Sequence, residues 1–320
     1  MPGRRRPEQP SVAIVTDSTA SLPEGAAERW GVGVVPLDVV VDGERHVEGV
    51  DLSPQALLAA LTKGVTVTTS QPPPAAFASA YERAAASGAR EIVSIHLSGE
   101  LSGTVRAARL AAESSSVPVH VVDSGVVAMA LGFAVLDAAR FAAGPEAPAA
   151  PPAATGPLAA ARAWWHTRAR TEPRLPSAVE VAEHARTVAA STRVWFLVDS
   201  LDHLRRGGRL SVPATAIGIV LGLRPILTLH AGAIDVLEKV RTRRAARERL
   251  VALAVADVVR RPSARVAVHH LGQPEIAEAL AAEVAAASGG RLVETAVCES
   301  SAVLAAHAGP GLLAIVVADA

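Results

Sequence analysis

Short apolar runs that alternate with segments of helical length constrain the fold of this chain more than any other feature. Residues 12–15, 92–95 and 117–122 are largely apolar runs of strand length, and each is followed by polar residues and then by a helix-forming segment. Strands that are buried on both faces of a parallel sheet have this continuous apolar character. The alternation predicts the α/β fold class, with a doubly wound parallel sheet.

The chain divides into two such halves around one stretch of different composition. Residues 144–176 contain the string APAAPPAATGP, which is typical of a poorly ordered insertion or linker. We therefore predict an N-terminal α/β domain over residues 11–143 and a second, C-terminal α/β domain over residues 177–320. Residues 1–10 are rich in Pro and Arg and are predicted to be a disordered lead-in.

Composition excludes several classes of function. Lys and Arg together number 31, as do Asp and Glu, and this balance argues against a dedicated nucleic-acid binder. The single cysteine, Cys298, excludes an internal disulfide and a cysteine-based zinc site, and it fits a cytoplasmic protein. No apolar run reaches the ~18 residues of a membrane span, and the first residues lack the apolar core of a signal peptide. No nucleotide-binding phosphate loop or metal-ligand motif is present, so no cofactor or metal is expected.

A polar turn at residues 98–104 is the first candidate site. Its sequence, SGELSGT, follows the apolar run at 92–95 and precedes a predicted helix. Ligands of open α/β sheets bind at the carboxyl ends of strands, and the free N–H groups at a helix start favour an anion. Ser102 is predicted to be the N-cap of that helix, and a purely structural capping role is the alternative interpretation.

Two other segments carry polar residues that could join this turn. Thr69 precedes Pro72, Pro73 and Pro74, and these prolines predict a stiff loop without regular pairing. His307 lies in the string HAGPG, just before the last predicted strand. Taken alone, each of these residues is of a type that is common in loops next to Pro or Gly.

Taken together, six motifs in order make the chain similar to the DegV family over residues 11–320, apart from the insertion at 144–176. The motifs are Thr16-Asp17-Ser18, Thr69-Ser70-Gln71-Pro72, Leu101-Ser102-Gly103-Thr104, Asp199-Ser200-Leu201 with Leu204-Arg205-Arg206-Gly207-Gly208-Arg209, Arg224-Pro225-Ile226-Leu227, and His307 in HAGPG. The resemblance implies a two-domain DegV-like fold with one long-chain fatty acid bound between the domains. Several members are the binding subunit of a bacterial fatty acid kinase, in phospholipid metabolism. Such a subunit catalyses nothing itself and presents the carboxylate to a separate kinase subunit, which forms acyl phosphate.

The resemblance also implies roles for individual residues. Thr69 and Ser98 resemble the hydroxyls that hold the carboxylate, with Gly99 and Ser102 in the same turn, and His307 resembles the distal histidine of that network. Many members have a second serine where this chain has Gly99, so one donor is lost or replaced by a backbone N–H.

Two arginines resemble the partner-docking residues of the family. Arg209 is the first, and Arg241 is a second candidate. The residue before the carboxylate threonine is Thr68, where a lysine is common. This difference, like the one at Gly99, bears on which groups hold the carboxylate. The insertion at 144–176 bears on how a kinase partner would dock.

Physical estimates agree with a fatty acid as ligand. Burying roughly 14 methylenes at ~0.8 kcal/mol each contributes about 11 kcal/mol before the costs of immobilisation. Hydrogen bonds to the charged head contribute about 1.5–3 kcal/mol each. Two alternatives stay open at this stage. One is a hydrolase or phosphatase that uses Ser98 or Ser102 with His307, and the other is a regulatory protein whose lipid is a structural filler.

Overall fold

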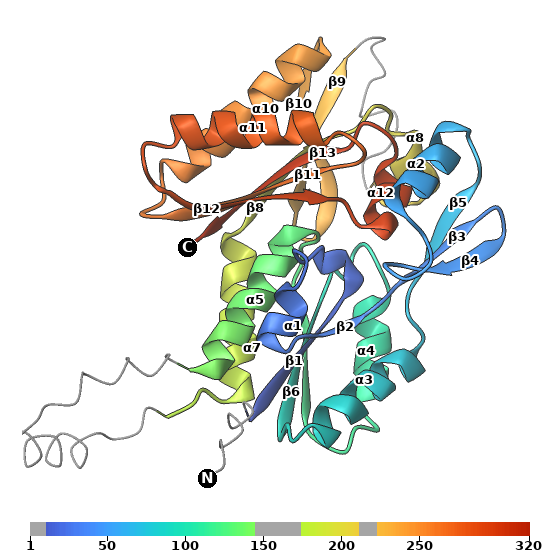
Figure 1. Cartoon of the computed structure of the whole chain (residues 1–320), viewed down its shortest axis with the longest axis vertical. Coiled ribbons are helices and arrows are strands. Elements are labelled where there is room, and N and C mark those ends of the chain that lie inside the picture. Colours follow the sequence, from blue (N-terminus) through green and yellow to red (C-terminus); the bar gives the residue numbers. More distant parts are fainter. Residues whose placement is uncertain (1–10, 145–173, 211–222) are drawn as a thin grey trace, which may run out of the picture.

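Two lobes, each built on a β-sheet, make up the part of the chain that the computed structural model describes, which is residues 11–144, 174–210 and 223–320 (Figure 1). The α/β class is as predicted. The predicted lead-in at 1–10 and most of the predicted insertion at 144–176 lie outside the described residues.

The first lobe contains the predicted parallel sheet. Its strands, in spatial order, are β2 (Gly33–Val35), β1 (Val12–Asp17), β6 (Glu91–His96) and β7 (Val119–Asp123). One face is covered by α3 (Pro74–Ala86) and α4 (Thr104–Ala112), and the other by α5 (Met129–Ala143) and α7 (Ala178–Ser191). The carboxyl ends of β1 and β6 point toward the second lobe (Figure 1).

Helix α7 differs from the prediction in its placement. It begins after the predicted boundary at residue 177, yet it packs mainly on α5, β6 and β7 of the first lobe. The reason lies in its buried stripe of Ala178, Val181, Ala182, Ala185 and Ala189, whose helical spacing and small size allow close packing. By its contacts, α7 belongs to the first lobe, although composition places residues 177 onward in the second domain.

The second lobe contains a mixed sheet rather than a second parallel one. Its strands, in spatial order, are β10 (Ala233–Val240), β9 (Arg224–His230), β8 (Arg193–Leu197), β13 (Leu313–Asp319), β11 (Ala264–His270) and β12 (Leu292–Glu299). Only β11 and β12 are parallel neighbours. Helices α10 (Arg243–Val258) and α11 (Pro274–Ala287) cover the outer face, and the other face looks toward the first lobe.

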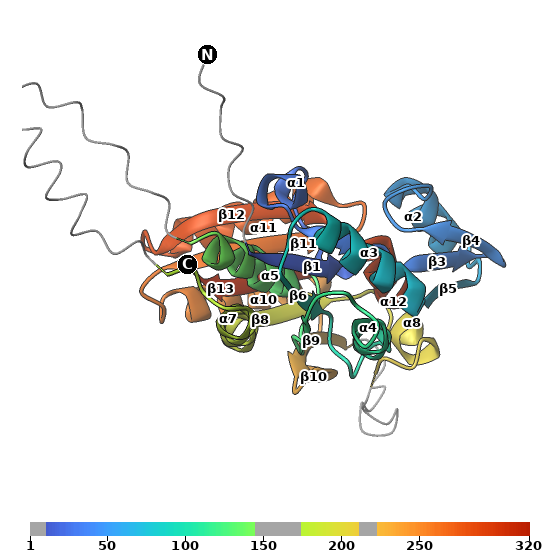
Figure 2. The same ribbon diagram turned by 90° about the horizontal axis from the view of Figure 1, so that it is seen from below.

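A small antiparallel sheet stands beside the two lobes and was not predicted as a unit. It consists of β4 (Glu44–Val47), β3 (Asp38–Val41) and β5 (Val67–Ser70), with α2 (Pro54–Thr62) next to it (Figure 2). Helix α12 (Ala302–Ala308), from the second lobe, packs against α2, β3 and β5 and against α8 (Asp202–Arg206). The short elements η1 (Ser18–Ala20) and α1 (Ala26–Trp30) complete the first lobe. Among the described residues, no helix has the length and apolar character that crossing a membrane requires.

A buried ion pair joins the two lobes. Arg265 of β11 donates from both terminal nitrogens to the carboxylate of Asp137 on α5, at 2.7 and 2.6 Å, and its Nε donates to the carbonyl of Asp319 at 2.9 Å. The guanidinium also lies 4.7 Å from the centroid of the Phe133 ring. Because both charges have largely left water, each depends on the other for compensation.

We expect Arg265→Met to lower the free energy of unfolding by about 3 kcal/mol, because Asp137 would keep a largely buried charge without its main partner. Urea denaturation followed by circular dichroism measures this. Arg140→Met is the matched control, since Arg140 bonds the same carboxylate from a position that is 39% exposed and should cost less than about 1 kcal/mol. If both variants lost the same free energy of unfolding, the Arg265–Asp137 pair would not be the dominant ion pair between the lobes.

Candidate ligand-binding site

A cavity that opens to solvent lies between the two lobes. The first lobe, the second-lobe sheet, the small sheet and α12 all contribute to its wall. The cavity therefore exists only where the lobes meet, which is the position that the sequence analysis predicts for the ligand.

Most of this wall is apolar. Prominent apolar lining residues are Leu97, Leu101, Val194, Phe196, Leu229, Ile234, Val303 and Ala314. Val194 and Phe196 are two apart on β8, so both side chains point to the same face of the sheet, toward the first lobe. A wall of this kind accommodates a hydrocarbon chain and offers it no hydrogen bonds.

One end of the cavity is polar and is closed by a pair of residues from distant parts of the chain. The Oγ1 of Thr69 lies 2.7 Å from the Nε2 of His307. Thr69 is on strand β5, where it pairs with Val39 of β3, so the prediction of an unpaired loop at this position is wrong. His307 is in the last turn of α12, a helix that the sequence analysis missed.

His307 is held in its neutral form. Burial, and secondarily the positive charge of Arg209, lowers the pKa of His307 to about 4. A neutral imidazole has one N–H donor and one acceptor nitrogen, and it adds no charge to the pair with Thr69. The polar end of the cavity therefore offers uncharged hydrogen-bonding groups.

Arg209 is part of the cavity wall rather than a free surface residue. It is half-buried, and its Nε donates to the carbonyl of Leu101 at 2.9 Å. A terminal nitrogen also donates to the carbonyl of Gly207. Two backbone oxygens thus fix the guanidinium beside the polar end, where it adds positive potential. Arg241, the second predicted docking residue, is exposed in the turn between β10 and α10.

The structure does not place Ser98 and Gly99 in the cavity wall. The Oγ of Ser98 is buried and donates to the carbonyl of Gly232, in the turn between β9 and β10, at 2.7 Å. The backbone N–H of Gly99 donates to the carboxylate of Asp123 at 3.1 Å. Ser98 therefore links the two lobes, a contact between residues 134 positions apart that no local pattern indicates.

Ser102 does line the cavity, together with Gly103 and Gln71. The Oγ of Ser102 lies 2.9 Å from the Oγ1 of Thr104. The N-cap of α4 is Gly103, one position later than predicted, because the chain turns into the helix only at Thr104. A side chain at Gly103 would collide with the amide of Gln71, so the glycine lets Gln71 approach. Gln71 is not among the predicted site residues, although it stands in the Thr69-Ser70-Gln71-Pro72 motif.

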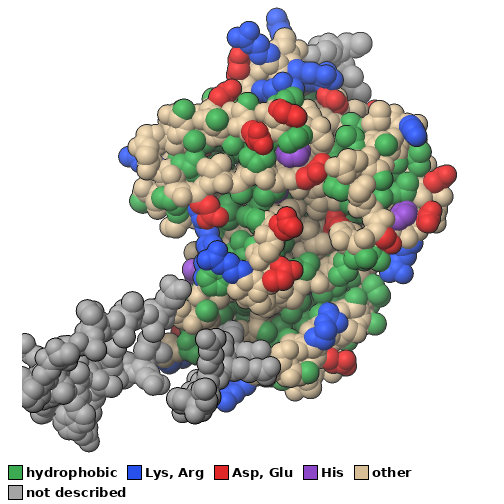
Figure 3. Space-filling model, viewed as in Figure 1, with side chains coloured by type: hydrophobic (Ala, Val, Ile, Leu, Met, Phe, Trp, Pro, Cys, Tyr) green, Lys and Arg blue, Asp and Glu red, His purple; other side chains and the backbone are tan. Residues whose placement is uncertain are grey.

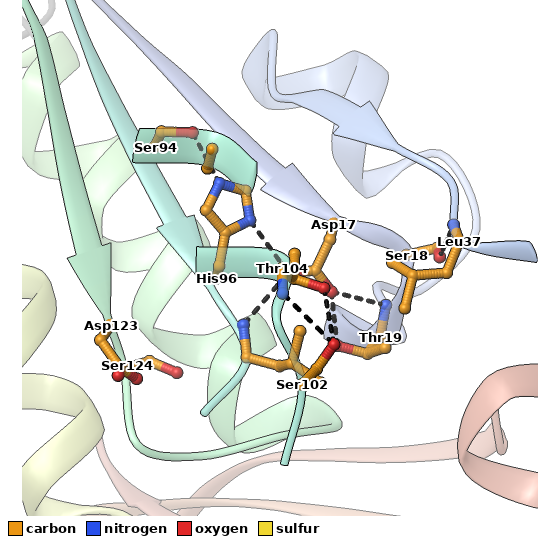
Figure 4. Close-up of polar contacts among 12 residues, drawn as sticks. Asp17, Ser18, Thr19, Leu37, Ser94, His96, Ser102, Thr104, Asp123 and Ser124 are labelled. Carbon is orange, nitrogen blue, oxygen red and sulfur yellow. Dashed lines mark hydrogen bonds and ion pairs between the residues drawn. The ribbon is translucent and has the colours of Figure 1, made fainter. Parts of the chain in front are cut away.

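A buried chain of Asp17, His96 and Ser94 has the composition of a catalytic triad (Figure 4). The Nδ1 of His96 lies 3.0 Å from the carboxylate of Asp17, and its Nε2 lies 2.6 Å from the Oγ of Ser94. All three residues are fully buried, and the hydroxyl of Ser94 contacts that of Tyr81 rather than a cavity. This arrangement fixes the ends of two strands and gives a substrate no access to the serine. The described residues also contain no cluster of side chains suited to a metal ion.

A second, more polar cavity shares the Thr69–His307 pair with the first. It is lined by Thr69, His307 and Arg209 and also by His203 and Arg206. Thr69 and His307 therefore stand between an apolar cavity on one side and an open, basic cavity on the other. This position gives a polar group held at the pair access from outside.

Fold and site together define a two-domain α/β protein with an interlobe cavity whose wall is mostly apolar. Its polar lining residues include Thr69, Ser102, Arg209, His269 and His307. The chain belongs to the DegV family: residues 11–149 and 176–320 match the family model described as an uncharacterised protein of the DegV family.

A DegV domain-containing protein of Streptomyces coelicolor is 45% identical over 308 residues, which cover 96% of this chain and 98% of the relative. Two solved structures are also similar. A DegV family protein from Thermus thermophilus, described by its fatty acid binding, shares 30% identity with a TM-score of 0.79, over 97% of this chain and 99% of its own. DegV of Bacillus subtilis, a fatty acid binding protein, shares 28% identity with a TM-score of 0.77, over the same fractions.

We expect the His307 imidazole to remain neutral throughout the range from pH 8 to pH 5. Since its folded pKa of about 4 lies below the ordinary 6.5, the stability that neutral His307 contributes is complete above pH 6.5 and is lost as the pH falls toward 4. Carbon–proton NMR of the imidazole Cε1, assigned with His307→Gln, measures this. A midpoint near 6.5 would contradict the burial that the structure shows.

Proposed function

We propose that this protein binds one long-chain fatty acid between its lobes and presents the carboxylate to a separate kinase subunit, which forms acyl phosphate. The observation that carries the proposal is the position of the Thr69–His307 pair, which separates an apolar cavity from an open, basic one. The fatty acid binding of the Thermus and Bacillus relatives supports the same ligand.

The hydrocarbon tail supplies most of the affinity in this proposal. Its methylenes leave water for a wall of Leu, Val, Ile and Phe side chains, each contributing ~0.8 kcal/mol. Ordering the tail and losing free motion offset a large part of this sum. The wall offers few polar partners, so it discriminates little between acids of similar shape. Selection for a carboxylate then falls to the polar end.

The carboxylate lies at the polar end, next to Thr69, His307 and Ser102. The hydroxyls of Thr69 and Ser102 donate to it, and the single N–H of neutral His307, on Nε2, donates to the Oγ1 of Thr69 and so leaves the Thr69 hydroxyl proton for the carboxylate. The guanidinium of Arg209, held by the carbonyl of Leu101, favours the charged form of the acid through its positive charge and needs no hydrogen bond to the carboxylate. In this proposal Ser98 acts indirectly, because its bond to Gly232 holds the turn that carries Ser102.

A phosphoryl donor reaches the carboxylate through the second cavity, on the other side of the pair. Arg206 and Arg209 make that entrance positive, which suits the negative phosphate groups of a nucleotide held by the kinase. Arg241, exposed and without a bond to the cavity wall, is the proposed docking contact, and Arg209 lies where a docked partner meets the ligand. The binding subunit itself is cytoplasmic and catalyses no step.

We expect Thr69→Val to weaken fatty acid binding about 10- to 150-fold, because it removes one hydrogen bond of about 1.5–3 kcal/mol to a charged group while keeping the shape of the side chain. Displacement of a fluorescent fatty acid measures affinity, and extraction with mass spectrometry identifies the acid that co-purifies. Thr68→Val is the matched control, since Thr68 is exposed on the other face of the same strand.

Unchanged affinity in Thr69→Val, or purification without any lipid, would overturn the carboxylate site. If the protein hydrolysed a fluorogenic ester or phosphate and this activity required Ser102 and His307, the hydrolase or phosphatase hypothesis would be favoured instead. Lipid binding without any acyl phosphate formation in the presence of kinase subunit and ATP would favour a regulatory protein whose lipid is a structural filler.

We expect Arg241→Gln to leave fatty acid affinity unchanged and to slow acyl phosphate formation by the kinase subunit about fivefold, as the loss of one exposed charge pair of ~1 kcal/mol predicts. The rate is measured with radiolabelled fatty acid and ATP. Arg291→Gln is the control, because Arg291 is exposed before β12, at the opposite edge of the second sheet. An equal effect of the two substitutions would exclude a specific contact at Arg241.

A further inference from the structure

A third concave site lies on the outer side of the second lobe, away from the interlobe cavity. Leu197 of β8 and Leu313 of β13 line it, whereas their neighbours Phe196 and Ala314 line the interlobe cavity. Because successive side chains of a strand point to opposite faces, the two sites lie on opposite faces of one sheet. The outer site is therefore separate from the fatty acid site.

Three arginines surround one carboxylate in this outer site. Arg224, Arg243 and Arg247 all line it, with Asp199 among them. A terminal nitrogen of Arg224 donates to the carbonyl and carboxylate oxygens of Asp199 at 3.1 and 3.3 Å, and one of Arg243 lies 3.0 Å from the same carboxylate oxygen. Gly311 packs so closely on Asp199 that any side chain there would collide with the carboxylate. Asp199 thus orders two guanidinium groups around a fixed point.

The charges of the site do not balance. Three guanidinium groups and one carboxylate leave an excess of two positive charges. In the described part of the chain, Arg247 has neither an ion-pair partner nor a hydrogen bond, and the side chain of Gln273 also faces the site. Positive charges collected in a hollow raise the local potential, so an anion that enters the hollow is attracted.

Two helices add to the positive potential. The first turn of α10 begins at Arg243, and α11 begins next to Gln273, whose side chain makes no capping bond. Helix N-termini carry partial positive charge, so arginines in the first turn of α10 are unfavourably placed by themselves. Figure 3 shows Lys and Arg side chains gathered at the top of the second lobe, over the start of α10. At the start of α10 the side chain of Thr242 already accepts the N–H of Ala245, so the contribution of the helix here is its partial charge.

We propose that Arg224, Arg243, Arg247 and Gln273 form a binding site for a phosphate monoester. Such a group carries a charge of about −1.5 to −2 at pH 7, which matches the excess of two positive charges. Its oxygens accept the paired N–H donors of guanidinium groups with good geometry. Arg247 is not paired with Asp199, so all of its N–H groups are free to donate to the phosphate. The amide of Gln273 supplies an uncharged donor.

The test uses the full-length protein with its fatty acid site intact. Isothermal titration with inorganic phosphate at constant ionic strength should show binding that Arg247→Gln weakens about tenfold, with fatty acid affinity unchanged. Arg244→Gln is the matched control: Arg244 is 88% exposed in the same helix turn, pairs with Glu248 and does not line the site. An equal loss in both variants, or no phosphate binding by the wild type, would overturn the proposal.

Further arms distinguish the sources of the phosphate group. Titration with a soluble phosphate monoester, glycerol 3-phosphate, is compared with flotation on vesicles that contain phosphatidic acid in phosphatidylcholine. Binding to both in an Arg247-dependent manner supports the shared headgroup chemistry, and binding to one alone identifies the source. Vesicle binding that Arg247→Gln and Arg244→Gln weaken equally would reflect general surface charge and would contradict a built site.

Discussion

The buried carboxylate of Asp17 is the interaction on which the rest of the site depends. It accepts hydrogen bonds from the backbone N–H and hydroxyl of Thr19 and from the backbone N–H of Leu97, and it lies 3.0 Å from the Nδ1 of His96. A fully buried charge without such partners would be prohibitively unfavourable, so the carboxylate fixes the ends of β1 and β6 relative to each other. Because Leu97 leads directly into the turn that carries Ser102, this contact positions one wall of the interlobe cavity.

The buried carboxylate of Glu48 positions the part of the cavity wall that the small sheet and α12 form. Glu48 accepts the N–H of Val303, in the first turn of α12, at 2.7 Å and the hydroxyl of Ser18 near the end of β1. Burial raises the pKa of Glu48, although these hydrogen bonds oppose the shift. The small sheet, the first lobe and α12 are therefore tied together at one point. Thr69 and His307, carried by the small sheet and by α12, meet because of this connection.

The sequence predicts the parallel sheet well, because fully apolar runs followed by polar turns have few other interpretations. It predicts β5 and α12 poorly. The three prolines after Gln71 indicate a loop, although the strand before them continues to Ser70. Helix α12 has only seven residues before Gly309 and Pro310, which is too short for a clear helical period. Of the predicted site residues, Thr69, Ser102 and His307 come together at the cavity. Ser98 does not, because its bond to Gly232 depends on how the lobes meet, which no local pattern contains.

The neutral character of the Thr69–His307 pair has a consequence for the proposed chemistry. A bidentate arginine would occupy both oxygens of a bound carboxylate and neutralise it. Here the guanidinium of Arg209 already donates to the carbonyls of Leu101 and Gly207. In the proposed complex it therefore contributes charge at short range, and the hydrogen bonds to the carboxylate come from uncharged groups. One face of a carboxylate held in this way keeps its lone pairs directed at the open cavity. An acid bound for storage needs no such opening, whereas an acid that is to attack a phosphoryl group does.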